Sequence, residues 1–251
     1  MSITAGWHNT PAVTASVTRW TGPQGQTAVT FGDVSTAEDV ILMIHGMAGS
    51  KERFLSLALD CVAAGKAVVA VDLPYHGARR SEPHGSIMLY PPHPQFMKVS
   101  ASVCNTLLAE LPTTLAAVGV TKPVSVLGHS LGGRIAYHMA LRNLDVQRVI
   151  SVGSPIGVES IPKGATFTEK DYGYWQEIDP FAGTADIRRV PITFIHGEKD
   201  KVCPLFTIER LQAQMRETSP DVQFDIKIVP DAGHEFVGAL EAAALAELIG
   251  A

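Results

Sequence analysis

A serine lies in the sequence GHSLG, residues 128–132, directly after the apolar run Val124–Leu127 and before a helical segment at about 131–142. Glycines two positions before and after Ser130 leave out the Cβ atoms that would clash in a very tight strand-to-helix turn. Such a turn exposes the hydroxyl and directs a helix N-terminus at any negative charge that develops beside it. The pattern predicts that Ser130 is a nucleophile and that the backbone N–H of Leu131 binds an oxyanion. A glycine-rich turn that only packs closely is the structural alternative.

A second glycine-bearing turn, HGMAG at residues 45–49, follows the apolar run Val40–Ile44. The tetrahedral intermediate of acyl transfer carries negative charge on its former carbonyl oxygen, and preorganised N–H donors must face that oxygen. The backbone N–H of Met47 is therefore predicted to act together with that of Leu131. A plain strand-to-helix turn is again the structural alternative.

An acid and a histidine follow two later apolar runs, in HGEKDKVCP at residues 196–204 and PDAGHEF at residues 230–236. Asp200 is predicted to orient the imidazole of His234 and to stabilise its protonated form, and His234 to act as the base. Glu198 is the competing acid, with a longer and more mobile side chain. The order serine, aspartate, histidine differs from the orders of chymotrypsin-type and subtilisin-type proteases.

The segments HGMAG, GHSLGG, GEKDKVCP and GHEF resemble the four motifs of the α/β-hydrolase superfamily, and the resemblance extends over nearly the whole chain. The stretch DLPYHGARR, residues 72–80, is similar to a segment of small bacterial serine carboxylesterases, in which Asp72 and His76 would have structural roles. The resemblance implies an α/β-hydrolase fold with an acyl-enzyme intermediate on Ser130. GHSLGG lacks the spacing of a dinucleotide-binding motif and the lysine of a phosphate-binding loop, so no cofactor is expected.

Short apolar runs alternate with helical segments along most of the chain, which predicts a mostly parallel central sheet flanked by helices. The stretches Ala12–Trp20 and Gln26–Phe31 flank a TGPQG turn and predict an N-terminal β-hairpin. Nothing in the composition divides the chain, so residues 1–251 are expected to form a single domain. The predicted strands and helices are as follows: strands at 40–44, 67–71, 124–127, 149–152, 192–195 and 224–229, and helices at about 51–64, 96–118, 131–142, 205–217 and 236–249.

Residues 155–189 carry Pro, Gly and several aromatic side chains, and are predicted to form a short cap or lid. Within this segment Tyr174 and Trp175, together with His129 beside the serine, are assigned to the substrate pocket. Aromatic side chains of this segment fit equally well as the small core of a lid, because pockets and lid cores use the same residue types.

The composition excludes several classes of protein. Charged residues make up 18% of the chain and the formal net charge is −5, so a nucleic-acid partner is not expected. Apolar runs are too short to span a bilayer and no polybasic segment is present, so no membrane partner is expected. Three widely spaced cysteines, and an N-terminus without a signal-peptide pattern, favour a cytoplasmic protein. The histidines match no metal-ligand spacing, so no metal is expected.

These observations predict a serine-type carboxylesterase that cleaves small-molecule esters with small acyl chains. The same side chains could act on thioesters, lactones, amides or carbon–carbon bonds, or transfer the acyl group to an alcohol. A small-molecule-binding protein without activity is an alternative of another class. The sequence leaves the natural substrate and the oligomeric state open.

Overall fold

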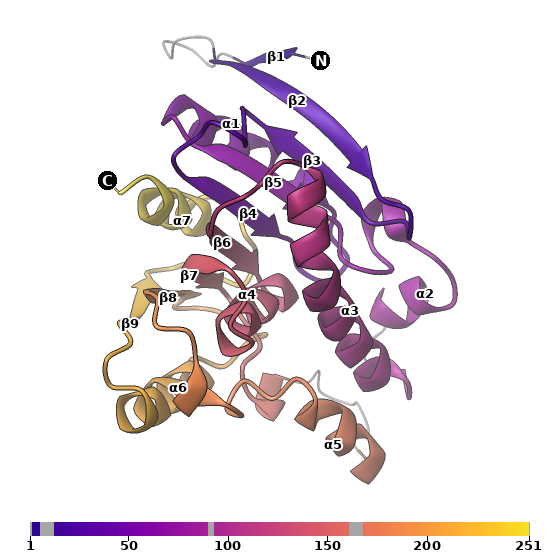
Figure 1. Cartoon of the computed structure of the whole chain (residues 1–251). Coiled ribbons are helices and arrows are strands. Elements are labelled where there is room, and N and C mark those ends of the chain that lie inside the picture. The colour runs from indigo at the N-terminus through magenta and orange to yellow at the C-terminus, as the bar shows by residue number, and fades with distance from the viewer. Residues whose placement is uncertain (1, 6–12, 90–92, 161–167, 251) are drawn as a thin grey trace.

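A twisted sheet of nine strands organises the chain in the computed structural model, which describes residues 2–5, 13–89, 93–160 and 168–250 (Figure 1). The spatial order is β1-β2-β3-β5-β4-β6-β7-β8-β9. The strands are β1 (Ser2–Ala5), β2 (Val13–Thr21), β3 (Thr27–Phe31), β4 (Val40–Ile44), β5 (Ala67–Val71), β6 (Val124–His129), β7 (Val146–Val152), β8 (Ile192–Gly197) and β9 (Phe224–Val229).

The six strands from β5 to β9 in this order run parallel to one another, whereas β3 pairs antiparallel with both β2 and β5. The mostly parallel sheet and the N-terminal hairpin of β2 and β3 are therefore confirmed, although Ala12, the first residue of the predicted hairpin, lies outside the described residues. β1, which pairs with β2, was not predicted. It extends the antiparallel edge of the sheet.

Helices cover both faces of the sheet (Figure 1). The α-helices are α1 (Leu55–Ala63), α2 (His84–Leu89), α3 (Phe96–Ala117), α4 (Leu131–Leu141), α5 (Glu169–Gln176), α6 (Leu205–Thr218) and α7 (Ala239–Ile249), and the 3-10 helices are η1 (Lys51–Phe54), η2 (Gly77–Arg79), η3 (Val158–Ser160) and η4 (Thr184–Asp186). Five α-helices match predicted segments; α2 and α5 were not predicted. In the described part of the chain, no helix combines the length and the hydropathy that crossing a bilayer requires.

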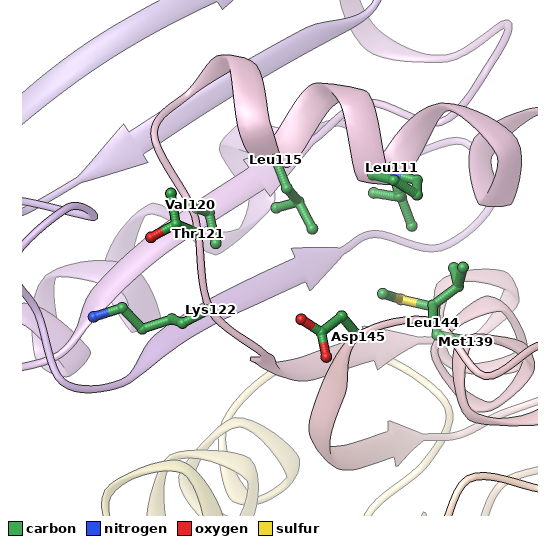
Figure 2. A pocket seen from close by; sticks show the side chains of 9 residues that line it. Leu111, Leu115, Val120, Thr121, Lys122, Met139, Leu144 and Asp145 are labelled. Atoms are coloured by element: carbon green, nitrogen blue, oxygen red, sulfur yellow. The ribbon is translucent and has the colours of Figure 1, made fainter.

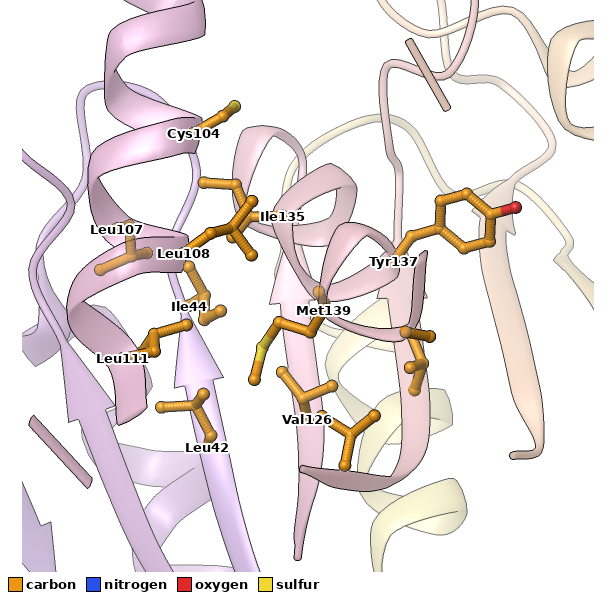
Figure 3. Close-up of a cluster of buried hydrophobic side chains, with 14 of the residues drawn as sticks. Leu42, Ile44, Cys104, Leu107, Leu108, Leu111, Val126, Ile135, Tyr137 and Met139 are labelled. Carbon is orange, nitrogen blue, oxygen red and sulfur yellow. The ribbon is translucent and has the colours of Figure 1, made fainter. Parts of the chain in front are cut away.

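Side chains that alternate along β4 divide the core into two layers. Leu42 and Ile44 pack with α3, α4 and α6 on one face, and Ile41 and Met43 pack with α1 and α7 on the other. Successive strand residues point to opposite faces, so a strand buried on both sides must be apolar throughout, as VILMI is. Figure 3 shows the first layer, in which α3 and α4 pack over β4 and β6.

The predicted cap segment is described up to residue 160 and from residue 168 onward, and its residues 161–167 lie outside the described part. Its main element, α5, lies beside α3 (Figure 1). The N-cap of this helix is Thr168, whose hydroxyl accepts from the N–H of Asp171 while the Asp171 carboxylate accepts from the N–H of Thr168. This capping box explains how a short polar helix forms in a segment without apolar periodicity.

Candidate active site

Ser130 occupies a strained turn between β6 and α4. Its φ of 53° and ψ of −119° lie in a region that a side chain other than glycine rarely adopts. The neighbouring glycines are required by contact: a Cβ on Gly132 would lie 2.1 Å from the carbonyl oxygen of Ile44, and a Cβ on Gly128 would lie 2.1 Å from that of Gly132. The serine N–H donates to the carbonyl of Val152 at 2.8 Å, which ties the turn to β7.

A chain of hydrogen bonds joins the three residues predicted to act together. Oγ of Ser130 lies 3.1 Å from Nε2 of His234, and Nδ1 of His234 lies 2.8 Å from Oδ2 of Asp200. A carboxylate only accepts, so Nδ1 carries the proton and Nε2 is left to accept from the serine hydroxyl. The structure thus brings together, from the carboxyl ends of β6, β8 and β9, the three residues predicted to act as nucleophile, base and orienting acid.

The Asp200 carboxylate is held in its ionised form. Burial alone would raise the pKa of Asp200, but hydrogen bonds from His234 and from the backbone N–H groups of Cys203 and Val202 outweigh burial and lower it. The competing acid, Glu198, is exposed and accepts a hydrogen bond from the N–H of Asp231 at 3.1 Å. It is Asp200 that reaches the imidazole.

The two residues predicted to bind the oxyanion lie beside the serine. Met47 and Leu131 both line the pocket that contains Ser130, and neither N–H has a hydrogen-bond partner among the described residues. The lack of a side chain at Gly46 allows the two turns to approach each other closely, because a Cβ there would lie 3.0 Å from Cβ of Ser130. Free donors at a helix N-terminus and an adjacent turn are suited to an oxyanion.

A buried ionic cluster supports the turn that carries Met47. The Asp72 carboxylate accepts from Nζ of Lys51 at 2.6 Å, from the N–H of Lys51 at 2.9 Å and from the Thr27 hydroxyl at 2.7 Å. Burial opposes ionisation of Asp72, but the hydrogen bonds from Lys51 and Thr27 lower its pKa. His45 donates from Nδ1 to the Gly46 carbonyl and accepts at Nε2 from the N–H of Leu73. Burial lowers the pKa of His45 to about 4, so the ring is neutral.

The pocket at the serine has a volume of about 80 Å³. Of the residues assigned to it, Trp175 lines it, whereas Tyr174 packs half-buried against the core and His129 donates from Nε2 to the backbone carbonyl of His234 at 2.9 Å. The lining residues are Met47, Phe96, Met97, Ser100, Ser130, Leu131, Arg134, Pro155, Ser160, Trp175, Val202 and Cys203.

Sequence reasoning missed the contribution of α3 and of Arg134 to this pocket. Phe96 and Met97 come from the start of α3, and only the docking of that helix over the sheet brings them to the serine. Arg134 had a local signal, because a residue four positions after Ser130 lies on the same side of a helix that begins there.

Asp200, Cys203 and His234 form a group whose possible ligand atoms lie within 4.8 Å of one another, a spacing that could also suit a metal ion. The hydrogen bond between His234 and Asp200 explains this short spacing better than a metal ion does. Nδ1 of His234 and the carboxylate are already engaged with each other, and burial raises the pKa of the Cys203 thiol, which opposes the thiolate that metal binding needs.

A larger pocket, of about 260 Å³, lies at the amino ends of β6 and β7, whereas Ser130 follows the carboxyl end of β6. Figure 2 shows the side chains that line it. It is lined by residues of α3 and α4 and by the turns that precede β6 and β7, among them Leu111, Leu115, Lys122 and Met139. Parallel α/β sheets bind ligands at the carboxyl ends of their strands, and this pocket lies at the other ends. None of Ser130, Asp200 and His234 lines this larger pocket.

Comparison with known proteins agrees with this architecture. The model of the α/β-hydrolase fold family matches residues 39–166, and that of the prolyl oligopeptidase family matches residues 120–248. The chain belongs to the α/β-hydrolase fold family, as the motifs predicted.

Individual proteins match this chain either over only part of its length or with low sequence identity. The sn-1-specific diacylglycerol lipase ABHD11 of Xenopus tropicalis is 34% identical over 122 residues, which are 48% of this chain and 33% of that protein, so the match spans about a third of the length of this curated relative. Among solved structures, TT1662 from Thermus thermophilus has a TM-score of 0.75 at 21% identity, with 94% of this chain and 99% of that chain covered. Acetyl xylan esterase 1 from Thermoanaerobacterium has a TM-score of 0.68 at 16% identity, with 100% and 87% covered.

Proposed function

We propose that this protein is a serine hydrolase that cleaves small carboxylic esters through an acyl-enzyme intermediate on Ser130. The observation that carries the proposal is the hydrogen-bond chain from the Ser130 hydroxyl through His234 to Asp200. The names of its relatives, a diacylglycerol lipase and an acetyl xylan esterase, agree with ester hydrolysis. The small volume of the pocket favours short acyl groups.

A side chain or a backbone N–H group acts in each step of the proposed reaction. His234 accepts the hydroxyl proton at Nε2 as Oγ of Ser130 bonds to the ester carbonyl carbon, and the N–H groups of Met47 and Leu131 bind the resulting oxyanion. The tetrahedral intermediate collapses, the carbon–oxygen bond to the alcohol breaks, and the imidazolium protonates the leaving alkoxide. Asp200 stays ionised and stabilises the imidazolium throughout.

The second half of the reaction repeats the first with water. His234 removes a proton from water, whose oxygen attacks the acyl carbon, and the oxyanion forms again between the same two N–H groups. When this intermediate collapses, the bond to Oγ of Ser130 breaks and the serine recovers its proton from the imidazolium. The carboxylic acid leaves and the site is restored.

Labelling with a fluorophosphonate probe tests the nucleophile, with the Ser130→Ala variant as the control. We expect the probe to label the wild type and not the variant. A folded wild type that is not labelled contradicts the proposal and favours a binding protein without activity.

A panel of 4-nitrophenyl esters from acetate to octanoate tests the bond that is cleaved, beside a thioester, a lactone, an amide and a substrate for carbon–carbon cleavage. The ester proposal requires the highest kcat/KM on a short ester. A higher value on another class would reassign the reaction while keeping the same residues.

A further inference from the structure

Arg134 is a buried cation in the pocket of the proposed nucleophile. It lies on α4 four residues after Ser130, lines the same pocket and is only 4% exposed. A guanidinium is not deprotonated in proteins, so its charge is present in the folded state. Four residues of helix span roughly 6 Å along the axis, which sets the scale of its separation from the serine.

The guanidinium has neutral partners only. Nε donates to the carbonyl of Pro155 at 2.6 Å, and Nη2 donates to the same carbonyl. The central carbon of the guanidinium, Cζ, lies 4.4 Å from the centre of the Trp175 ring. Among the described residues no carboxylate forms an ion pair with Arg134, and Nη1 has no hydrogen-bond partner. The segments outside the described part contain no Asp or Glu. Asp179 acts on Arg134 only through its charge.

A buried charge without a directly paired counter-ion is unfavourable, so a ligand that brings one would be bound strongly here. Ser160 lines the same pocket, and its hydroxyl is buried with no hydrogen-bond partner among the described residues. Because Trp175 covers one face of the guanidinium, the edge remains for hydrogen bonds in its plane. A guanidinium edge can bind a carboxylate or a phosphate through two hydrogen bonds, and the smaller, planar carboxylate suits so small a pocket better.

We propose that Arg134, together with Ser160, binds a carboxylate of the substrate, so that the protein acts on esters that carry a free carboxylate a few atoms from the scissile carbonyl. This inference rests on the proposed ester hydrolysis. The carboxylate can belong to the acyl group, as in a monoester of a short dicarboxylic acid, or to the leaving alcohol. Both place an anion beside the same guanidinium.

Matched pairs of esters test the proposal and separate its two sources. The acyl pair is the 4-nitrophenyl monoester of glutaric acid against 4-nitrophenyl hexanoate, and the alcohol pair is 4-acetoxybenzoate against 4-acetoxybenzamide. In the wild type we expect kcat/KM to favour the anionic member of at least one pair by about tenfold or more, as hydrogen bonds to charged groups allow. Preference for the neutral member of both pairs overturns the inference and leaves ester hydrolysis intact.

Variants assign the preference to the residue. Arg134→Met is expected to reduce the anionic-to-neutral ratio to about one, and Arg134→Lys, which keeps the charge and loses the planar fork, to give an intermediate ratio. Arg142→Met makes the same change of charge on an exposed residue at the end of α4, and should keep the wild-type ratio. An unchanged ratio in both folded Arg134 variants overturns the inference. If Arg134→Met does not fold, the anionic-to-neutral ratio of Arg134→Lys alone tests the inference.

Binding measured without turnover separates this inference from the proposed function. Glutarate is titrated calorimetrically into Ser130→Ala, with Ser130→Ala/Arg134→Met and Ser130→Ala/Arg134→Lys as comparisons. If replacement of Arg134 in the Ser130→Ala background abolishes glutarate binding or weakens it about tenfold, the carboxylate site is supported even if the wild type cleaves no ester. Absence of binding to Ser130→Ala, with neutral esters still cleaved by the wild type, overturns the site alone.

Discussion

The imidazole of His129 donates its Nε2–H to the backbone carbonyl of His234, at 2.9 Å. Its ring also packs against that of Phe236, with the centroids 5.4 Å apart. Burial lowers the pKa of His129 to about 4, so the ring is neutral near neutral pH. The residue that precedes the proposed nucleophile therefore holds the backbone of the proposed base in place.

Replacing His129 by Phe keeps a ring of similar shape and removes the donor. We expect kcat to fall about tenfold with little change in KM, because the carbonyl loses its partner and His234 loses its fixed position. Steady-state kinetics on a short ester measure this. His129→Gln, which can still donate, serves as the control and should retain more of the activity. Equal losses of kcat in the two variants would contradict a role for the hydrogen bond.

Asp200→Asn is expected to lower kcat by about 10³-fold to 10⁴-fold, because an amide no longer fixes the proton on Nδ1 of His234. The matched control is Glu198→Gln, two residues away on the same turn and exposed. That variant should keep nearly all of the activity. If Glu198→Gln lost as much activity as Asp200→Asn, the assignment of the acid would be wrong.

Gly132→Ala is expected to destabilise the fold severely, by about 3 kcal/mol or more, because the new Cβ would lie 2.1 Å from the carbonyl oxygen of Ile44. The three nearest atoms are backbone atoms of Ile44 and His45, which can move little because they end a central strand. Gly173→Ala in α5 is the control, since a Cβ at that position would have no other atom within 4 Å. It should be neutral or stabilising by about 0.5–1 kcal/mol. Urea unfolding of the two variants checks both values.

Asp72→Asn is expected to lower the free energy of unfolding by about 3–5 kcal/mol near pH 7, because it removes the buried charge partner of the Lys51 ammonium and leaves only the exposed Glu52 carboxylate, at 3.1 Å from Nζ. Hydrogen bonds from Lys51 and Thr27 lower the pKa of Asp72 in the folded state despite its burial. Its stabilisation is therefore complete above the unfolded pKa of about 3.9 and is lost as the pH falls through the lower folded value.

Urea unfolding from about pH 7 down to pH 3 measures this dependence. The difference between the wild type and Asp72→Asn should stay constant above about pH 5 and shrink below pH 4. Asp145→Asn, which breaks an exposed pair with Arg188, should change stability little at any pH. If the difference in the free energy of unfolding between the wild type and Asp72→Asn grew as the pH falls, a lowered pKa of Asp72 could not explain it.

Several elements could be predicted from the sequence because their signals are local. The strands Val40–Ile44, Ala67–Val71 and Phe224–Val229 have the predicted bounds, since each apolar run is delimited by polar or turn residues. The serine turn has its own glycine pattern. That pattern, with an acid and a histidine after later strands, was sufficient to select the three residues that the structure brings together.

Other features depend on tertiary packing and carry no local signal. The helix α2 forms in a segment rich in proline, histidine and glycine, and α5 relies on a capping box in a polar stretch. His129 was assigned to the pocket by its position beside the serine, but the direction of its side chain is set by its hydrogen bond to the loop of His234. Burial of Arg134 without an acidic partner is likewise a property of the assembled pocket.

The backbone strain at Ser130 has a thermodynamic consequence. Glycine adopts a φ of 53° without the penalty that a Cβ brings, so Ser130→Gly should be more stable than Ser130→Ala by about 1–2 kcal/mol. Comparison of their thermal unfolding checks this. The side chain of the proposed nucleophile thus lowers the stability of the fold that holds it. Replacement by glycine would relieve this strain, whereas loss of the hydroxyl alone would not, because alanine keeps the Cβ atom.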